Sequence, residues 1–170
     1  MYEAAVFVIL PICLVVAAFT DLFEMTVPNR IPAILLTSFI LIAPFSGLSL
    51  PEFGWHILAG VTVFSVVFGL FAINVMGGGD AKLLTAAAVW YGFTPSLLHF
   101  LIYVAYGGGI LTILILLVRA RANSVMALNL PVPHSILTAK KIPYAIAICV
   151  GGLVTFPQSP LVLTALEQIR

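Results

Sequence analysis

The stretch Met76-Gly-Gly-Gly-Asp-Ala-Lys-Leu-Leu84 places three consecutive glycines, an aspartate and a lysine between two apolar runs. An ionised aspartate in a bilayer core costs about 3 kcal/mol on insertion scales, and backbone groups exposed at glycine need hydrogen-bond partners there. A membrane protein that keeps both features in one segment is expected to use them. Asp21 and Glu24 are the other acids close to an apolar run on the same predicted side, and we predict that Asp80 pairs with Asp21.

Composition identifies an integral membrane protein. Of the 170 residues, 62% are hydrophobic and 8% are charged, whereas soluble domains carry about 25% charged residues. The net charge of +1 gives no overall attraction to nucleic acid. No basic segment precedes the first apolar run, so we expect that run to remain as a helix. With no long polar linker, residues 1–170 are predicted to form one membrane domain.

The spacing of the apolar runs predicts a bundle of six transmembrane helices, because one span needs about 20 apolar residues. We expect helices at about residues 4–20, 31–45, 53–75, 81–93, 96–118 and 142–156, followed by a short surface helix up to Arg170. The fourth helix, at roughly 20 Å, is shorter than the ~30 Å hydrocarbon core. We therefore expect Asp80 at or below the membrane surface, in a pocket screened from lipid.

Charge predicts the orientation of this bundle. Six spans place nearly all basic residues on one side, namely Arg30, Lys82, Arg119, Arg121, Lys140 and Lys141. Only Arg170 falls on the other side. Because the side richer in lysine and arginine is cytoplasmic, Asp21, Glu24 and Asp80 are expected at the cytoplasmic face, with both termini outside.

Two carboxylates on one membrane face can form an aspartyl protease dyad. Close like charges share one proton, so one carboxylate can deprotonate a water while the other polarises the scissile carbonyl. The proton belongs to the pair and is assigned to neither acid. The glycines at 77–79, namely Gly77, Gly78 and Gly79, would let an extended substrate approach without meeting a Cβ, and could supply N–H groups.

Simpler roles compete for the same residues. Asp21 could end the first helix and Asp80 could cap the fourth, although a plain cap does not need three glycines. Lys82 is a candidate substrate-binding cation or a snorkelling lysine. Glu24 could attract a basic substrate segment or be an exposed loop acid. The alternative functions are a proton- or ion-coupled transporter that uses both aspartates and a non-catalytic assembly subunit.

Other polar or unusual residues give weaker signals. His56, His99 and His134 lack metal-ligand spacing, and Cys13 and Cys149 form no CxxC motif, so we predict neither a metal site nor a cofactor. The glycines at 107–109 favour close helix packing or a bend.

Three segments resemble type IV prepilin peptidases, which are membrane aspartic proteases. The 76–84 stretch is similar to their GxGD motif, which continues with Lys-Leu. Asp21 followed by Val27-Pro-Asn29 is similar to their first catalytic aspartate and Ile-Pro-Asn segment. Lys141-Ile-Pro-Tyr-Ala-Ile-Ala147 resembles the Ile-Pro-Tyr-Gly-x-Ala segment of the short members that serve Flp, or tight-adherence, pili, with Ala145 in place of a frequent glycine.

The resemblance implies a six-helix GxGD bundle in the bacterial inner membrane with Asp21 and Asp80 as the catalytic pair. The substrate would be a prepilin or pseudopilin whose short basic leader is cut after a glycine at the cytoplasmic face. Longer members carry a cysteine-bearing insert and also N-methylate the product. No such insert lies between Asp21 and Pro28, so peptidase activity alone is expected.

Overall fold

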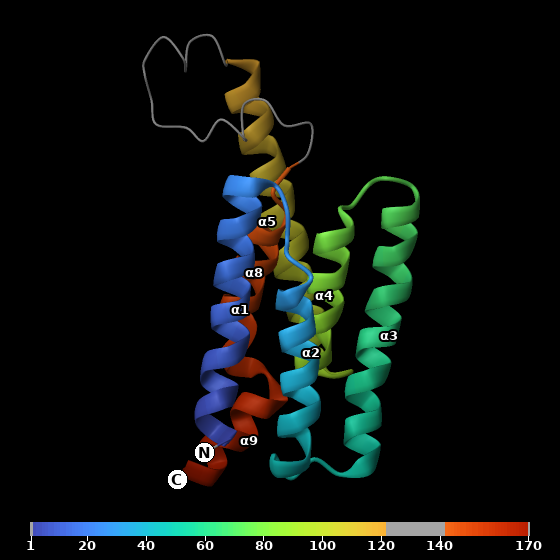
Figure 1. The fold of residues 1–170 in the computed structure, drawn as a ribbon, viewed down its shortest axis with the longest axis vertical. Helices are drawn as coiled ribbons and strands as arrows, with labels where there is room; N and C mark the ends of the chain where they lie inside the picture. The colour runs from blue at the N-terminus through green and yellow to red at the C-terminus, as the bar shows by residue number, and fades with distance from the viewer. Residues whose placement is uncertain (1, 122–141, 170) are drawn as a thin grey trace.

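The computed structural model describes residues 2–121 and 142–169, and every regular element in these ranges is helical (Figure 1). The predicted all-α class is therefore confirmed for this part of the chain. The elements, in chain order, are α1 (Tyr2–Glu24), α2 (Arg30–Ile42), η1 (Ala43–Phe45), α3 (Leu50–Ala72), α4 (Gly78–Tyr91), α5 (Pro95–Ala120), α8 (Ala145–Thr155), η2 (Phe156–Gln158) and α9 (Pro160–Ile169).

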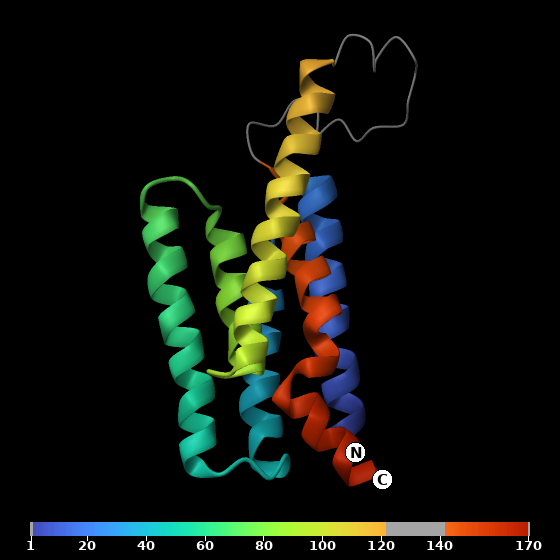
Figure 2. The same ribbon diagram turned by 180° about the vertical axis from the view of Figure 1, so that it is seen from behind.

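Successive helices run up and down the long axis of the molecule, and α4 lies among the others (Figures 1 and 2). Helix α4 packs against α2, α3 and α8, while α8 packs against α1 and α5. Ten of the fourteen residues of α4 are buried. The end of α1 and the start of α4, which carry Asp21 and Asp80, therefore lie at the same end of the molecule.

Within residues 2–121 and 142–169, three single helices are long and apolar enough to cross a membrane: α1, α3 and α5. Helices α8 and α9, joined through η2, are bent by 41° and count as a fourth span if taken together. The chain is thus a multi-pass membrane protein. Helices α2 and α4 are shorter, with 13 and 14 residues.

The first helix continues past Asp21, whereas the sequence predicted that it ends just before this residue. Leu22, Phe23 and Glu24 add another turn, since none of them disfavours helix. Met25 then ends α1 in a left-handed conformation with φ of 53°, and its N–H donates to the carbonyl of Asp21 over 3.0 Å. Asp21 consequently lies on a helix that fixes its direction, and not in a loop.

The last helix also differs from the prediction. Helix α9 was expected on the surface, but Leu161, Val162 and Ala165 are buried, and the helix packs against α1 and α4. Pro157 and Pro160 flank the bend that turns α9 back onto the bundle.

Small residues allow α5 and α8 to approach closely. A Cβ on Gly108 would overlap the ring of Tyr144, and a Cβ on Gly151 would lie 2.9 Å from the backbone nitrogen of Val104. Of the two roles considered for the glycines at 107–109, the structure supports close packing for Gly107 and Gly108.

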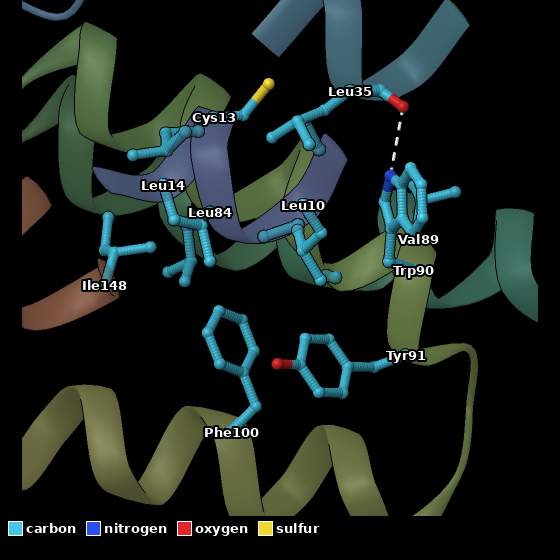
Figure 3. Packing of buried hydrophobic residues seen from close by; sticks show 14 of the residues in the cluster. Leu10, Cys13, Leu14, Leu35, Leu84, Val89, Trp90, Tyr91, Phe100 and Ile148 are labelled. Carbon is cyan, nitrogen blue, oxygen red and sulfur yellow. Dashed lines mark hydrogen bonds between the residues drawn. The ribbon is translucent and has the colours of Figure 1, made fainter. Parts of the chain in front are cut away.

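The core brings together side chains from α1, α2, α4, α5 and α8 (Figure 3). Trp90 is buried and donates its indole N–H to the carbonyl of Leu35 over 3.0 Å. The ring of Tyr91 stacks on Phe100 with centroids 4.6 Å apart. Helix α4 is thereby held on both sides.

The buried hydroxyl of Tyr91 supports a prediction about stability. It donates to the carbonyl of Gly152 over 2.8 Å and accepts from Thr155 over 3.0 Å, which ties α4 to α8. Tyr91→Phe should lower the free energy of unfolding by about 1 kcal/mol, because buried polar groups lose their partner. Thermal unfolding in detergent measures this loss, and Tyr106→Phe, at a side chain that is 72% exposed, is the matched control. Equal stability of the two variants would contradict the prediction.

Candidate active site

A cavity of about 210 Å³ opens where the segment after α1 meets the segment that begins α4. Both predicted acids line it. Asp21 is 5% exposed and Asp80 is 8% exposed. The residues that line the cavity are Asp21, Met25, Thr26, Val27, Gly77, Gly78, Gly79, Asp80 and Ile142. The structure thus brings together two acids that are far apart in the sequence.

Asp21 is held by the far end of the chain. Its Oδ2 accepts a hydrogen bond from the N–H of Ala145, the first residue of α8, over 3.0 Å. A helix N-terminus offers backbone N–H groups without helical partners and a partial positive charge, and both favour a carboxylate. Sequence reasoning did not assign this role to Ala145. Its only signal was Ile142-Pro143 before an apolar run, which is typical of a helix start.

Asp80 lies in the first turn of α4, directly after the glycines. A Cβ on Gly77 would come within 2.7 Å of Asp80 Oδ2, so only glycine leaves this carboxylate in place. A Cβ on Gly79 would lie 3.0 Å from the Cβ of Val27. A Cβ on Gly78 would lie 3.2 Å from the ring of Phe71. Each glycine therefore permits a different close approach.

The other two predicted site residues lie beside the cavity and do not line it. Glu24 is exposed at the end of α1. Lys82 is exposed on α4, and its Nζ donates to the side-chain oxygen of Asn29 over 2.9 Å. Four of the cavity residues, Met25, Thr26, Val27 and Ile142, were not predicted from the sequence, because three are apolar and none carries a titratable group.

Tyr144, which precedes α8, is half-buried and lies within electrostatic reach of Asp80. Burial raises the pKa of its hydroxyl, and the charge of Asp80 raises it further. The hydroxyl therefore stays protonated around neutral pH. In the described ranges, 2–121 and 142–169, no three His, Cys, Asp or Glu side chains come together in a group that could hold a metal ion.

Two buried carboxylates from different helices, meeting at one cavity in a multi-pass helical protein, are the arrangement of a membrane aspartic protease. The profile of the type IV leader peptidase family matches residues 8–113, which is more than half of the chain. The chain belongs to this family, the aspartic prepilin peptidases. No match was found among curated proteins or among solved structures.

Proposed function

We propose that Asp21 and Asp80 are the catalytic pair of a peptidase that removes the short basic leader of a prepilin or pseudopilin. The observation that carries this proposal is that both buried carboxylates line one cavity. Membership of the leader peptidase family supports the reaction class. Residues 1–170 would form a single catalytic domain.

The chemistry needs one ionised and one protonated carboxylate. The ionised acid takes a proton from a water, which attacks the scissile carbonyl, while the protonated acid donates a hydrogen bond to the carbonyl oxygen. The tetrahedral intermediate collapses when a proton reaches the leaving amine nitrogen. A cavity of about 210 Å³ exceeds the roughly 30 Å³ that one water occupies in the liquid. The glycine wall leaves room for the substrate backbone.

We also infer a cytoplasmic active site in the bacterial inner membrane, within a six-helix bundle in which α2 and α4 are short membrane helices. The start of α4 and the end of α5, which carry Lys82 and Arg119, lie in the half of the molecule where α1 ends, and α2 with Arg30 starts deeper, toward the middle (Figure 1). At the opposite end, the charged residues that the structure describes are Glu3, Glu52 and Glu167. This asymmetry supports a cytoplasmic cavity with both termini outside.

The absence of an insert between Asp21 and Pro28 supports cleavage without N-methylation, as does the resemblance to the short members that serve tight-adherence pili. The test is to reconstitute the full chain in vesicles with a candidate prepilin and a sulfonium methyl donor, so that N-methylation is chemically possible. Mass spectrometry should find a product that begins directly after a glycine and lacks the mass of a methyl group. An uncleaved prepilin together with ion flux through the vesicles would instead favour a transporter. A methylated product would refute the peptidase-only proposal.

Glu24 is proposed to attract the basic leader, since it is exposed one turn after Asp21. Exposed ion pairs contribute about 0.2–1 kcal/mol, so Glu24→Gln should raise KM about two- to fivefold and leave kcat unchanged. The increase should disappear with leaders whose lysines are neutralised, and it should shrink at high salt. Glu167→Gln, at an exposed acid of the opposite end, is the control. An unchanged KM with basic leaders would remove this role.

A further inference from the structure

We propose that Lys82 and Asn29 form a clamp that positions the two walls of the cavity, and that Lys82 acts through Asn29 and not on the substrate. The inference rests on the proposed catalytic pair. Lys82 Nζ donates to Asn29 Oδ1 over 2.9 Å, between residues 53 positions apart. Lys82 thus joins α4, which carries Asp80, to the segment that follows Asp21.

The side chain of Asn29 does not cap its own helix. Asn29 stands at the N-cap of α2, where asparagine ordinarily accepts from a backbone N–H of its own helix. Here it has helical backbone angles, φ −57° and ψ −20°, and makes no side-chain cap hydrogen bond. Its oxygen instead accepts from Lys82. Helix α2 thus lacks a side-chain cap, and the Asn29 oxygen is used for the hydrogen bond to Lys82 on α4.

A second contact lies beside this hydrogen bond. Gly79 packs so closely on Val27 that an added Cβ would lie 3.0 Å from the Val27 Cβ and 3.4 Å from its backbone nitrogen and oxygen. Gly79 and Lys82 lie on either side of Asp80 in the sequence. Gly79 contacts Val27, and Lys82 contacts Asn29. Val27 and Gly79 also line the cavity. The clamp and the packing of Gly79 on Val27 therefore hold the two walls together at the residues on either side of Asp80.

The placement of Lys82 argues against direct contact with the scissile bond. Its side chain is exposed, and it does not line the cavity. An exposed hydrogen bond of this kind contributes about 1 kcal/mol or less to stability. A catalytic group misplaced by about 1 Å, however, can lower the rate on the order of 100-fold. Loss of the clamp should consequently affect turnover more than folding.

The experiment is a double-mutant cycle measured with reconstituted full-length protein and a candidate prepilin. Lys82→Met keeps the apolar stem and removes the donor, and Asn29→Ala removes the acceptor. Each should lower kcat about tenfold with KM within about twofold of the starting protein, and the double variant should be no slower than the single variants. Asn29→Asp and Lys82→Arg keep an acceptor or a donor and should retain most of the activity. Thermal unfolding should change little.

A readout without substrate separates this inference from the proposed function. Val27→Cys with Gly79→Cys places two Cβ atoms 3.0 Å apart, which is shorter than the roughly 3.5–4.5 Å of a disulfide, so the two thiols can join once the walls move slightly outward. Oxidative cross-linking of this pair should slow severalfold when Lys82→Met or Asn29→Ala is added. If the chain cleaves no prepilin while cross-linking still responds, the function is wrong and the clamp stands.

Three outcomes would overturn the clamp. The first is normal cleavage by both Lys82→Met and Asn29→Ala. The second is a raised KM in Lys82→Met with kcat unchanged, which would place Lys82 in substrate binding. The third is a double variant whose losses are the product of the single losses, since independent residues behave in that way.

Discussion

Asp80→Asn is expected to abolish leader cleavage, lowering kcat by about 10³-fold or more. Asparagine keeps the size of the side chain but can neither take nor give the proton that the reaction needs. Asp21→Asn should have an effect of the same order, although its side-chain oxygen can still accept from the N–H of Ala145. Single-turnover cleavage of a prepilin measures both losses.

The controls for this prediction follow from the pairing of the acids. In the proposed pair the two carboxylates act as a unit, so the double variant should be no slower than either single variant. Glu167→Gln, at an exposed acid of α9, should cleave normally. Full processing by either aspartate variant would refute the dyad.

Gly77→Ala should lower kcat on the order of 100-fold while the protein stays folded. The new Cβ would lie 2.7 Å from Asp80 Oδ2, so the carboxylate must move. Only the reacting group is displaced, because Gly77 lies just before α4 and is partly exposed. The loss in kcat should therefore exceed any rise in KM that the new Cβ causes in the glycine wall.

Two other glycines, Gly78 and Gly69, supply matched controls for this change. Gly78→Ala meets only the ring of Phe71, which is 45% exposed and can shift, so its loss should be smaller. Gly69→Ala on α3 meets nothing within 4 Å and should leave cleavage unchanged. If Gly77→Ala cleaves as fast as Gly69→Ala, the 77–79 segment does not set the position of Asp80.

Much of this arrangement was predictable from the sequence. Long apolar runs indicated α1, α3 and α5, because about 20 consecutive apolar residues have few alternatives to a membrane span. The glycine stretch and Asp21 indicated the cavity, since buried charge and flexible backbone are costly in a bilayer. The two acids and the glycines could therefore be predicted to share one cavity, because such residues are exceptional in an apolar chain.

Contacts between distant segments were not predictable in this way. The sequence around Asp21 is compatible with a loop or with another helical turn. In the structure α1 continues through Asp21, and the Asp21 side chain contacts the start of α8. Nothing local reveals that Asn29 pairs with Lys82, since each is an ordinary polar residue near a helix start. The extension of α1 and the burial of α9 were missed for the same reason.

The bond from Ala145 to Asp21 has a consequence for biosynthesis. Both acids leave the ribosome well before α8 does, because the N–H that holds Asp21 belongs to Ala145, 65 residues after Asp80. A nascent chain thus carries its reactive groups without the support that orients one of them. Proteolytic competence is expected to appear only after α8 has been translated and inserted, which protects the membrane from a half-made protease.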